Sequence, residues 1–376
     1  MASIKLMEVT KNIKPKVAVV SLNFSPGHIS HLKAYQLLFT SLGCKTSIFL
    51  ADGYREFVGE NPSIKYTDDY KSIVRSQPDV VFMYNISIDN IKLAKECRRK
   101  GINSIYVLHE PMGGWKELAK EGKAIVRAIG ALVVNREICK NVSKVLLASE
   151  TGKQNYERYM RSCNGNYSVF PLIFQDEYDD QKTYERKYFS YIGGFTAAHG
   201  SNEYLKFVEY ALEKNEDIKF LIATKNEIDG VLEGEPFKTA IAKGRLSVQS
   251  GRPMTTEEIN SFYRQSICVW NAYNRSTQSG VLPNALMQAT PVIVNRNGAA
   301  KEVIEDREAG CYISMPPKNE EVLESYRYIW QHIQKMEDAA RKVFLEKYCY
   351  TSQLELAETT ILSLQNQCES SREDLA

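Results

Sequence analysis

Short apolar runs rich in β-branched residues alternate along the chain with segments of helical periodicity, and this alternation constrains the fold more than any other feature. A strand at residues 16–22 precedes a helix at 31–43, and the pattern repeats through both halves. Further strands are expected at 45–51, 80–85, 104–110, 131–135, 144–149, 188–193, 218–224, 246–251, 267–273, 291–296 and 310–314. The alternation predicts an α/β protein with doubly wound, parallel sheets covered by helices.

The length of the chain predicts two domains, because 376 residues exceed what one hydrophobic core usually organises. The alternation breaks at a polar, tyrosine-rich connector and restarts at residue 188, which places a boundary near Asp180. We therefore expect one Rossmann-like domain over 1–180 and a second over 181–345. The remaining segment, 346–376, contains an amphipathic helix and a polar, frayed tail.

The charge balance argues against nucleic acid as a partner. Lys and Arg number 48 and Asp and Glu number 46, so no global basic field favours nucleic acid, and any anion site is local. The eight cysteines lack CxxC or metal-type spacing, which indicates reduced core residues. With neither a signal-like apolar region nor a run of about eighteen apolar residues, the expected location is the cytoplasm.

Three loops between a strand and a helix predict an anion site in the second half. Ligands of such sheets bind beyond the carboxyl ends of the strands. The loop "NRSTQSG" brings Arg275 close to the backbone amides around Ser279, Gly280 and Val281, a setting that suits a phosphate or diphosphate. The turns at 193–200 and 295–300 are small or polar as well. A surface loop with a polar helix cap remains the alternative for any one of them.

The second half resembles the C-terminal domain of the GT-B group 1 glycosyltransferases, retaining, sugar-nucleotide-dependent enzymes typical of bacterial surface-polysaccharide and lipid-glycan assembly. It carries "YIGGFTAAHG", "LSVQSGRPMTTEEINSFY", "ALMQATPVIV" and "NGAAKEVIEDREAGCYIS" in the family's order. The first half resembles the acceptor-side domain through "SLNFSPGH", "VLHEPMGGW" and "VLLASETGKQNYERY". The resemblance implies GT-B architecture, with two Rossmann-like domains facing a cleft and a C-terminal helix that packs back toward the first.

The departures from the family pattern fall on charged positions. Gly194 and His199 stand where the family has a phosphate-binding Arg and Lys, Asn284 stands at the second glutamate, and the first glutamate falls near Ser276. Either the site is degenerate and the protein is a silent relative, or other cations have taken over the charge. The cations expected at the same sheet edge are Lys225, Arg252 and Arg275.

The resemblance and the loop positions together give a set of candidate residues. His109 ends a strand where the family presents a His to the donor sugar, with a packed structural His as the alternative, and its neighbour Glu110 is either an acceptor partner or a loop carboxylate. These two are the candidate catalytic residues. The candidate donor-binding residues are Gly27, His28, Gly194, His199, Lys225, Arg252, Arg275, Ser276, Gln278, Ser279, Gly280 and Asn284.

These observations predict a glycosyltransferase that moves a sugar from a nucleotide-diphosphate sugar to a glycan or lipid-linked acceptor, with retention. Neither cofactor nor metal is expected, because the acidic pairs Asp68–Asp69 and Asp179–Asp180 have the setting of solvated charges. A silent GT-B scaffold in glycan assembly is the main alternative, and a sugar-nucleotide epimerase is a third. Peripheral contact with the inner face of the membrane, through residues 98–100 or the C-terminal helix, is left open.

Overall fold

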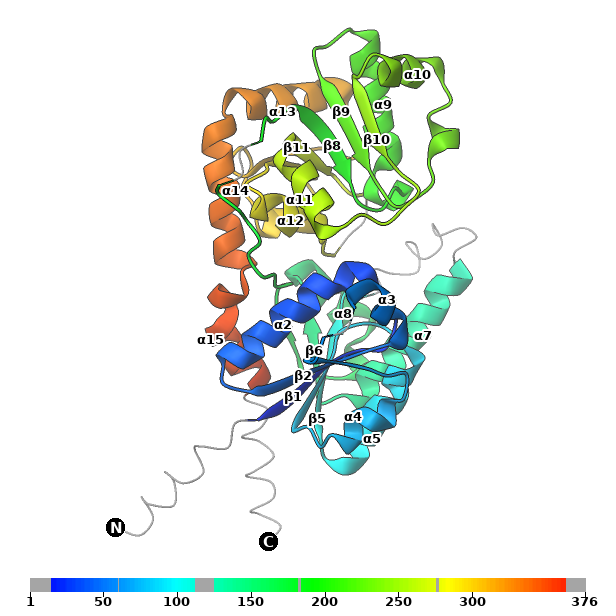
Figure 1. The fold of residues 1–376 in the computed structure, drawn as a ribbon, viewed down its shortest axis with the longest axis vertical. Helices are drawn as coiled ribbons and strands as arrows, with labels where there is room; N and C mark the ends of the chain where they lie inside the picture. The colour runs from blue at the N-terminus through cyan, green and yellow to red at the C-terminus, as the bar shows by residue number, and fades with distance from the viewer. Residues whose placement is uncertain (1–14, 60, 112–124, 182–183, 275–276, 363–376) are drawn as a thin grey trace, which may run out of the picture. The chain divides into compact units, whose positions relative to one another are not determined.

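The computed structural model describes residues 15–59, 61–111, 125–181, 184–274 and 277–362. The chain forms two compact units (Figure 1). One comprises the described residues within Met1–Gln175 and Tyr350–Ala376, and the other comprises those within Asp176–Cys349. The described C-terminal residues thus belong to the first unit.

The first unit is built on a parallel seven-stranded sheet of order β3-β2-β1-β4-β5-β6-β7. Its strands are β1 (Lys16–Ser21), β2 (Lys45–Leu50), β3 (Ile64–Tyr66), β4 (Val80–Met83), β5 (Asn103–Leu108), β6 (Lys144–Leu147) and β7 (Tyr167–Val169). Its α-helices include α2 (Ile29–Ser41), α3 (Arg55–Val58), α4 (Tyr70–Arg75), α5 (Ile88–Lys100), α7 (Ile125–Asn141), α8 (Glu150–Tyr159) and α15 (Leu354–Ala357).

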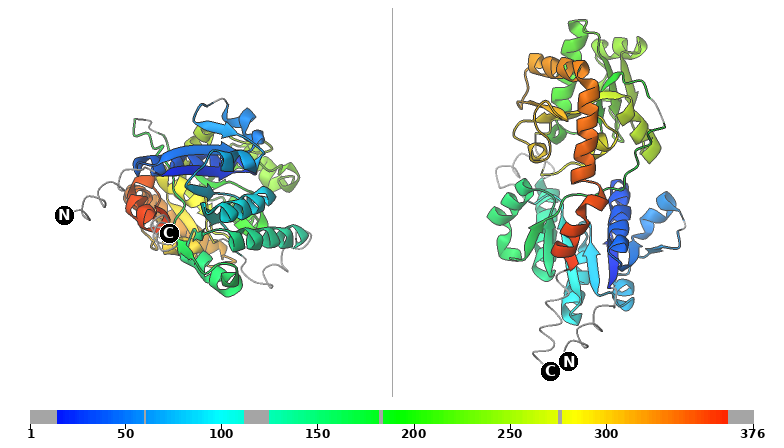
Figure 2. Two further views of the ribbon diagram at one scale, coloured as in Figure 1. Left: turned by 90° about the horizontal axis from the view of Figure 1, so that it is seen from below. Right: turned by 90° about the vertical axis from the view of Figure 1, so that its left-hand side faces the viewer.

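Both faces of this sheet are buried, because successive side chains of a strand point to opposite faces. Val17 and Val19 of β1 join a core that includes α2, whereas Ala18 and Val20 join a core with α4, α5 and α7. The C-terminal segment, red in Figure 2, completes the α2 side, where Ala357 is fully buried.

The second unit has a parallel six-stranded sheet of order β10-β9-β8-β11-β12-β13. Its strands are β8 (Tyr188–Ile192), β9 (Lys219–Ala223), β10 (Leu246–Gln249), β11 (Ser266–Asn271), β12 (Val292–Asn295) and β13 (Gly310–Ile313). Its α-helices include α9 (Ser201–Glu213), α10 (Glu235–Ala242), α11 (Thr256–Arg264), α12 (Val281–Met287), α13 (Asn319–Gln331) and α14 (Ile333–Lys347). Trp270 of β11 is among the largest fully buried side chains of its core.

Local predictions failed at four places. Residues 131–135 were expected as a strand but lie inside α7, because a short apolar run does not distinguish a strand from part of a longer helix. Residues 299–306, whose sequence favours a helix, form only a 3₁₀ turn at Ala299–Glu302. The edge strands β3 and β7 were missed, since each has three residues and little apolar pattern.

Candidate functional site

A candidate ligand site of the second unit lies where its strand order reverses, between β8 and β11. From β8 the chain continues to one side of the sheet, and from β11 it continues to the other. Ligands of parallel α/β sheets bind at the carboxyl ends of strands beside such a reversal. The loops there comprise residues 193–200 and the described residues 272–274 and 277–280, and these carry five of the predicted donor-binding residues: Gly194, His199, Gln278, Ser279 and Gly280.

The two loops are joined directly. The backbone amide of Asn274 donates to Ala198 O at 3.0 Å, and its side-chain amide donates to Ala197 O at 2.9 Å. The His199 ring stacks on the Tyr273 ring, with centroids 4.3 Å apart and planes at 19°. The structure therefore brings the residues after β8 and β11 into one assembly.

His199 is held by one ring nitrogen. Its Nδ1 lies 3.0 Å from Gly194 O, the same carbonyl that accepts the Tyr191 hydroxyl at 2.8 Å. The side chain is half-buried, and among the described residues none makes a hydrogen bond with Nε2. Nε2 is thus the nitrogen that remains for a ligand.

The Ser279 side chain caps the first turn of α12, whose N-cap residue is Gly280. Its Oγ accepts hydrogen bonds from the Asn271 side chain at 2.9 Å, from Val281 N at 3.2 Å and from Leu282 N at 3.4 Å. The expectation of a free Val281 amide was therefore wrong, because a serine at this position satisfies the first helix amides itself.

Two backbone amides beside this cap remain available. The N–H groups of Ser279 and Gly280 have no acceptor within the parts of the chain that the structure describes. Asn284 donates its side-chain amide to Gly280 O at 2.7 Å, which leaves its carbonyl oxygen to face other donors. Gln278 is half-buried in the same loop.

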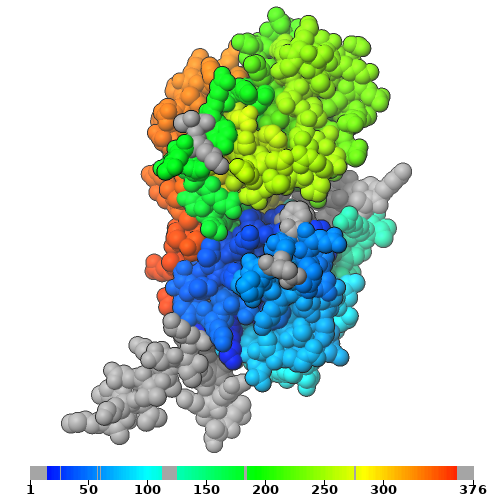
Figure 3. Space-filling view, in the orientation of Figure 1, coloured from blue at the N-terminus to red at the C-terminus, as the bar shows by residue number. Residues whose placement is uncertain are grey.

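The predicted cations differ in their surroundings. Arg252 donates to both carboxylate oxygens of Glu258, at 2.6 and 3.1 Å. That pairing, followed by the backbone N–H of Thr255, lowers the pKa of Glu258 to about 2. Within the described ranges Lys225 has no ion pair, and its side chain is exposed in the loop after β9. Figure 3 shows the surface of the second unit in green to orange. Arg275 and Ser276 lie outside the described residues.

The loop that carries Lys225 contacts the loop after β8. Asn226 Oδ1 accepts the backbone amide of Phe195 at 2.9 Å and is also bonded to the Thr224 hydroxyl at 3.0 Å. A side chain at position 225 is therefore on a loop that is fastened to the residues preceding His199.

The first unit has an equivalent reversal of strand order between β1 and β4. The loop after β1 carries Gly27 and His28, and β5 leads into His109 and Glu110. Gly27 and Glu110 are exposed, whereas His28 and His109 are half-buried. The structure places His28 and His109 side by side, with stacked rings 5.2 Å apart.

A compact aromatic cluster surrounds these two histidines. The Tyr84 ring lies 4.5 Å from that of His109, 5.2 Å from that of His28 and 5.6 Å from that of His31. His109 Nε2 is 2.6 Å from Tyr84 O, and because a carbonyl only accepts, this nitrogen carries the proton. His31 Nδ1 bonds Ile173 O at 3.1 Å in the same way.

All three imidazoles of this histidine cluster (His28, His31 and His109) are held neutral. Burial, followed by the charges of His109 and His31, lowers the pKa of His28 from the ordinary 6.5 to about 3. Burial and then His109 lower the pKa of His31 to about 3. Burial lowers the pKa of His109 to about 4, against the opposing effect of its hydrogen bond to Tyr84. Near neutral pH the cluster offers lone pairs and N–H groups rather than positive charge.

The sequence analysis did not select two residues at the carboxyl edge of the first sheet that lie close to the histidines. Tyr84 and Asn85 follow β4 directly at the reversal point, which was the available signal. Asn85 is 2% exposed, donates to Asn23 O at 2.5 Å, and has a buried Oδ1 with no partner among the described residues. His31 is buried in the cluster.

Within the described ranges, no group of three or more His, Cys, Asp or Glu side chains is arranged to hold a metal ion. The first of the two acidic pairs weighed earlier, Asp68–Asp69, has other partners. Asp69 caps α4 by accepting Lys71 N at 2.9 Å, and Asp68 accepts Asp52 N at 3.1 Å. In the same ranges no helix combines the length and apolarity needed to cross a bilayer.

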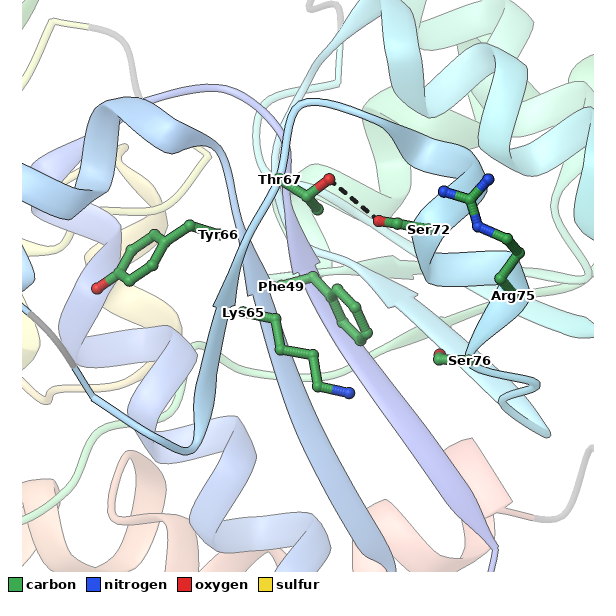
Figure 4. A pocket seen from close by; sticks show the side chains of 7 residues that line it. All are labelled: Phe49, Lys65, Tyr66, Thr67, Ser72, Arg75 and Ser76. Carbon is green, nitrogen blue, oxygen red and sulfur yellow. Dashed lines mark hydrogen bonds between the residues drawn. The ribbon is translucent and has the colours of Figure 1, made fainter.

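The first unit also contains an open pocket of about 380 Å³ between the β2–β3 edge and α4 (Figure 4). It is lined by Phe49, Lys65, Tyr66, Thr67, Ser72, Arg75 and Ser76. The hydroxyls of Thr67 and Ser72 bond each other at 3.0 Å, and Arg75 pairs with Asp69 at 2.9 Å. Because most of these polar groups already have partners, the pocket gives no specific indication of a ligand.

Solved structures with the same fold are glycosyltransferases. Sucrose-phosphate synthase from Thermosynechococcus elongatus superposes with a TM-score of 0.70 at 11% identity, covering 93% of this chain and 99% of that one. A glycosyltransferase from Rickettsia africae gives 0.66 at 11% identity, covering 94% and 98%. Anabaena HepE, solved with UDP and glucose, gives 0.67 at 13% identity, covering 93% and 100%.

These matches establish that the chain has the two-domain fold of the GT-B glycosyltransferases, as the sequence resemblance predicted. At the level of sequence, no protein-family model and no curated protein matches the chain.

Proposed function

We propose that the protein is a glycosyltransferase that moves a sugar from a nucleotide-diphosphate sugar to a glycan or lipid-linked acceptor. The fold supports this, and the structure of the similar HepE was solved with UDP and glucose. In this proposal the donor binds at the β8–β11 edge of the second unit, and the histidine cluster belongs to the acceptor-side unit. We further propose that the protein works in the cytoplasm.

The observation that carries the proposal is the pair of backbone amides at Ser279 and Gly280, which have no acceptor among the described residues and belong to the loops joined by Asn274. Adjacent N–H groups suit a phosphate oxygen because they donate without the cost of moving a side chain. Asn284 Oδ1 lies one helical turn further on and is suited to a hydroxyl of the donor.

We also propose that the reaction proceeds without a metal ion and with retention of configuration. Fixed amides and the cation Lys225 can stabilise the negative charge that develops on the leaving diphosphate. A histidine cluster held neutral on the first unit can accept or donate hydrogen bonds to sugar hydroxyls without adding charge.

Lys225→Ala is expected to weaken binding of a nucleotide-diphosphate sugar by about 10- to 100-fold, the range for losing one charge-assisted hydrogen bond. The measurement is calorimetric titration of UDP-, GDP- and ADP-sugars, with and without magnesium. Lys206→Ala, an exposed lysine on α9, is the control. Failure of every nucleotide sugar to bind would refute the donor site and favour a silent scaffold. Magnesium-dependent binding would refute the metal-free proposal.

Arg252→Ala is expected to change the same affinity by less than about threefold. Its guanidinium is exposed and already neutralised by Glu258, so little charge remains to attract a phosphate. A tenfold or larger loss in the same titration would show that Glu258 releases the guanidinium to the ligand, contrary to this expectation.

In this proposal a lipid-linked acceptor binds at the carboxyl edge of the sheet of the first unit. Peripheral contact with a membrane would bring a lipid-linked acceptor to the carboxyl edge that carries His109. The basic residues 98–100 end α5 and hence lie at the opposite, amino-terminal edge, where Arg99 also pairs with Glu96 at 2.6 Å. We therefore do not assign these basic residues to acceptor binding.

A further inference from the structure

The orientation of the His199 ring determines which nitrogen carries a proton. Nδ1 faces Gly194 O at 3.0 Å, and since a carbonyl oxygen only accepts hydrogen bonds, the hydrogen is on Nδ1. In a neutral imidazole, Nε2 then has a lone pair and no hydrogen. Neutral His199 therefore cannot donate from Nε2 to an anionic phosphate oxygen.

The surroundings keep the ring in this orientation. Tyr273 stacks on one face of the ring at 4.3 Å. A ring flip would replace the Nδ1 hydrogen bond by a carbon contact with Gly194 O, leaving that bond unmade. Gly200, which follows His199, has a φ of +73° and fits closely against Ala272 O. The backbone, and not the ligand, thus determines the tautomer.

Four ionisable groups lie on the elements around the ring, and among the described residues none of them forms an ion pair with it. They are Tyr191 of β8, Tyr273 after β11 and Glu203 in the first turn of α9, with Lys225 on the neighbouring loop after β9. Burial raises the pKa of Tyr191, so its phenol stays neutral. In the described part of the chain no carboxylate forms an ion pair or hydrogen bond with His199. The partner of an imidazolium at this position would be the ligand.

We propose that His199 binds the donor diphosphate only as an imidazolium, so that donor binding takes up a proton and strengthens as the pH falls. This inference rests on the proposed function and concerns the same site. Once protonated, Nε2–H donates a charge-assisted hydrogen bond to a phosphate oxygen. Affinity changes by up to about tenfold per pH unit wherever the free ring is neutral and the bound ring is charged.

In a competing arrangement, affinity for the donor changes with pH in the opposite direction. If neutral Nε2 accepts a hydrogen bond from a ribose or sugar hydroxyl, protonation removes the lone pair and weakens binding. The direction of the pH dependence therefore distinguishes recognition of phosphate from recognition of a hydroxyl.

The test is calorimetric titration of the full-length protein with UDP-glucose, GDP-mannose and ADP-glucose between pH 6.5 and 8.5. Both phosphates of these probes are diesters, which do not titrate in this range. Repeating each titration in buffers of different ionisation enthalpy counts the protons taken up. The variants are His199→Lys, with a fixed charge, and His199→Gln, with none. His332→Gln removes an exposed histidine of the second unit and is the control.

The expected result is tighter wild-type binding at lower pH with uptake approaching one proton per complex, and uptake near zero in both His199 variants. His199→Lys should bind with equal affinity across the range. His199→Gln should bind at least about tenfold more weakly than wild type at pH 6.5, with the difference shrinking as the pH rises toward 8.5. Binding without proton uptake, or binding that weakens in acid, would overturn the inference while leaving the proposed function intact. Absence of binding at every pH would refute both.

Discussion

Gly200→Ala is expected to lower the free energy of unfolding of the second unit by about 3 kcal/mol. The residue has a φ of +73°, which costs an L-residue about 1–2 kcal/mol. A Cβ would also lie 2.6 Å from Ala272 O and 2.9 Å from Trp270 Nε1, both too close to be tolerated. Relieving such overpacking costs about 1–3 kcal/mol more, because backbone and a buried indole have to shift.

Two other glycines allow the cost of the positive φ to be measured separately from the cost of overpacking. Gly244 has a φ of +66° with open space around its Cβ position, and Gly230 has open space and an ordinary φ. Denaturant unfolding followed through tryptophan fluorescence, to which the buried Trp270 contributes, should rank the variants Gly230→Ala, Gly244→Ala and Gly200→Ala in increasing cost. Equal costs for Gly244→Ala and Gly200→Ala would show that the contact with Ala272 is not a constraint.

The first unit is expected to lose stability as the pH falls below about 6.5. The folded-state pKa of His31 is about 3, against 6.5 for an exposed histidine, so between these values the unfolded chain binds more protons. The stabilisation is therefore complete above pH 6.5 and is lost as the pH falls toward 3. For the buried His31 the loss is up to about 1.4 kcal/mol per pH unit, or about 2 kcal/mol by pH 5.

His31→Gln tests this assignment, because glutamine can still donate to Ile173 O but does not titrate. Denaturant unfolding at pH 7 and pH 5 should show a smaller difference in free energy for this variant than for wild type. His332→Gln is the control, since His332 is exposed. An unchanged difference in His31→Gln would mean that the acid sensitivity has another origin.

The second unit's strands could be predicted because each is a short apolar run followed by a polar turn. All six predicted strands, from 188–193 to 310–314, are confirmed as β8 to β13. The strand predicted at 131–135 was wrong. The run "ALVVN" has strand-like composition, but its neighbours on both sides continue the helical period of α7.

The contacts of individual side chains could not be predicted from spacing. Arg252 and Lys225 both follow strands of one sheet, yet only the structure shows that Glu258, six residues on, neutralises Arg252. The tautomer of His199 depends on Gly194 O, and its stacking depends on Tyr273, which is far away in the sequence. These contacts depend on how separate loops pack against each other, which spacing in the sequence does not show. The positions of the candidate residues depend only on where strands end, which the sequence pattern does show.

The first unit is built from two stretches of the chain that are separated by the second unit, so part of its core is synthesised last. Its α2 side includes Ala357 and Ile361, both fully buried, while the intervening residues 176–349 form a unit of their own. The emerging chain therefore completes the second unit before the first has all of its core. Until these two residues leave the ribosome, the apolar surface that they bury beside α2 stays exposed, and exposed apolar surface of this kind makes a nascent chain prone to aggregation.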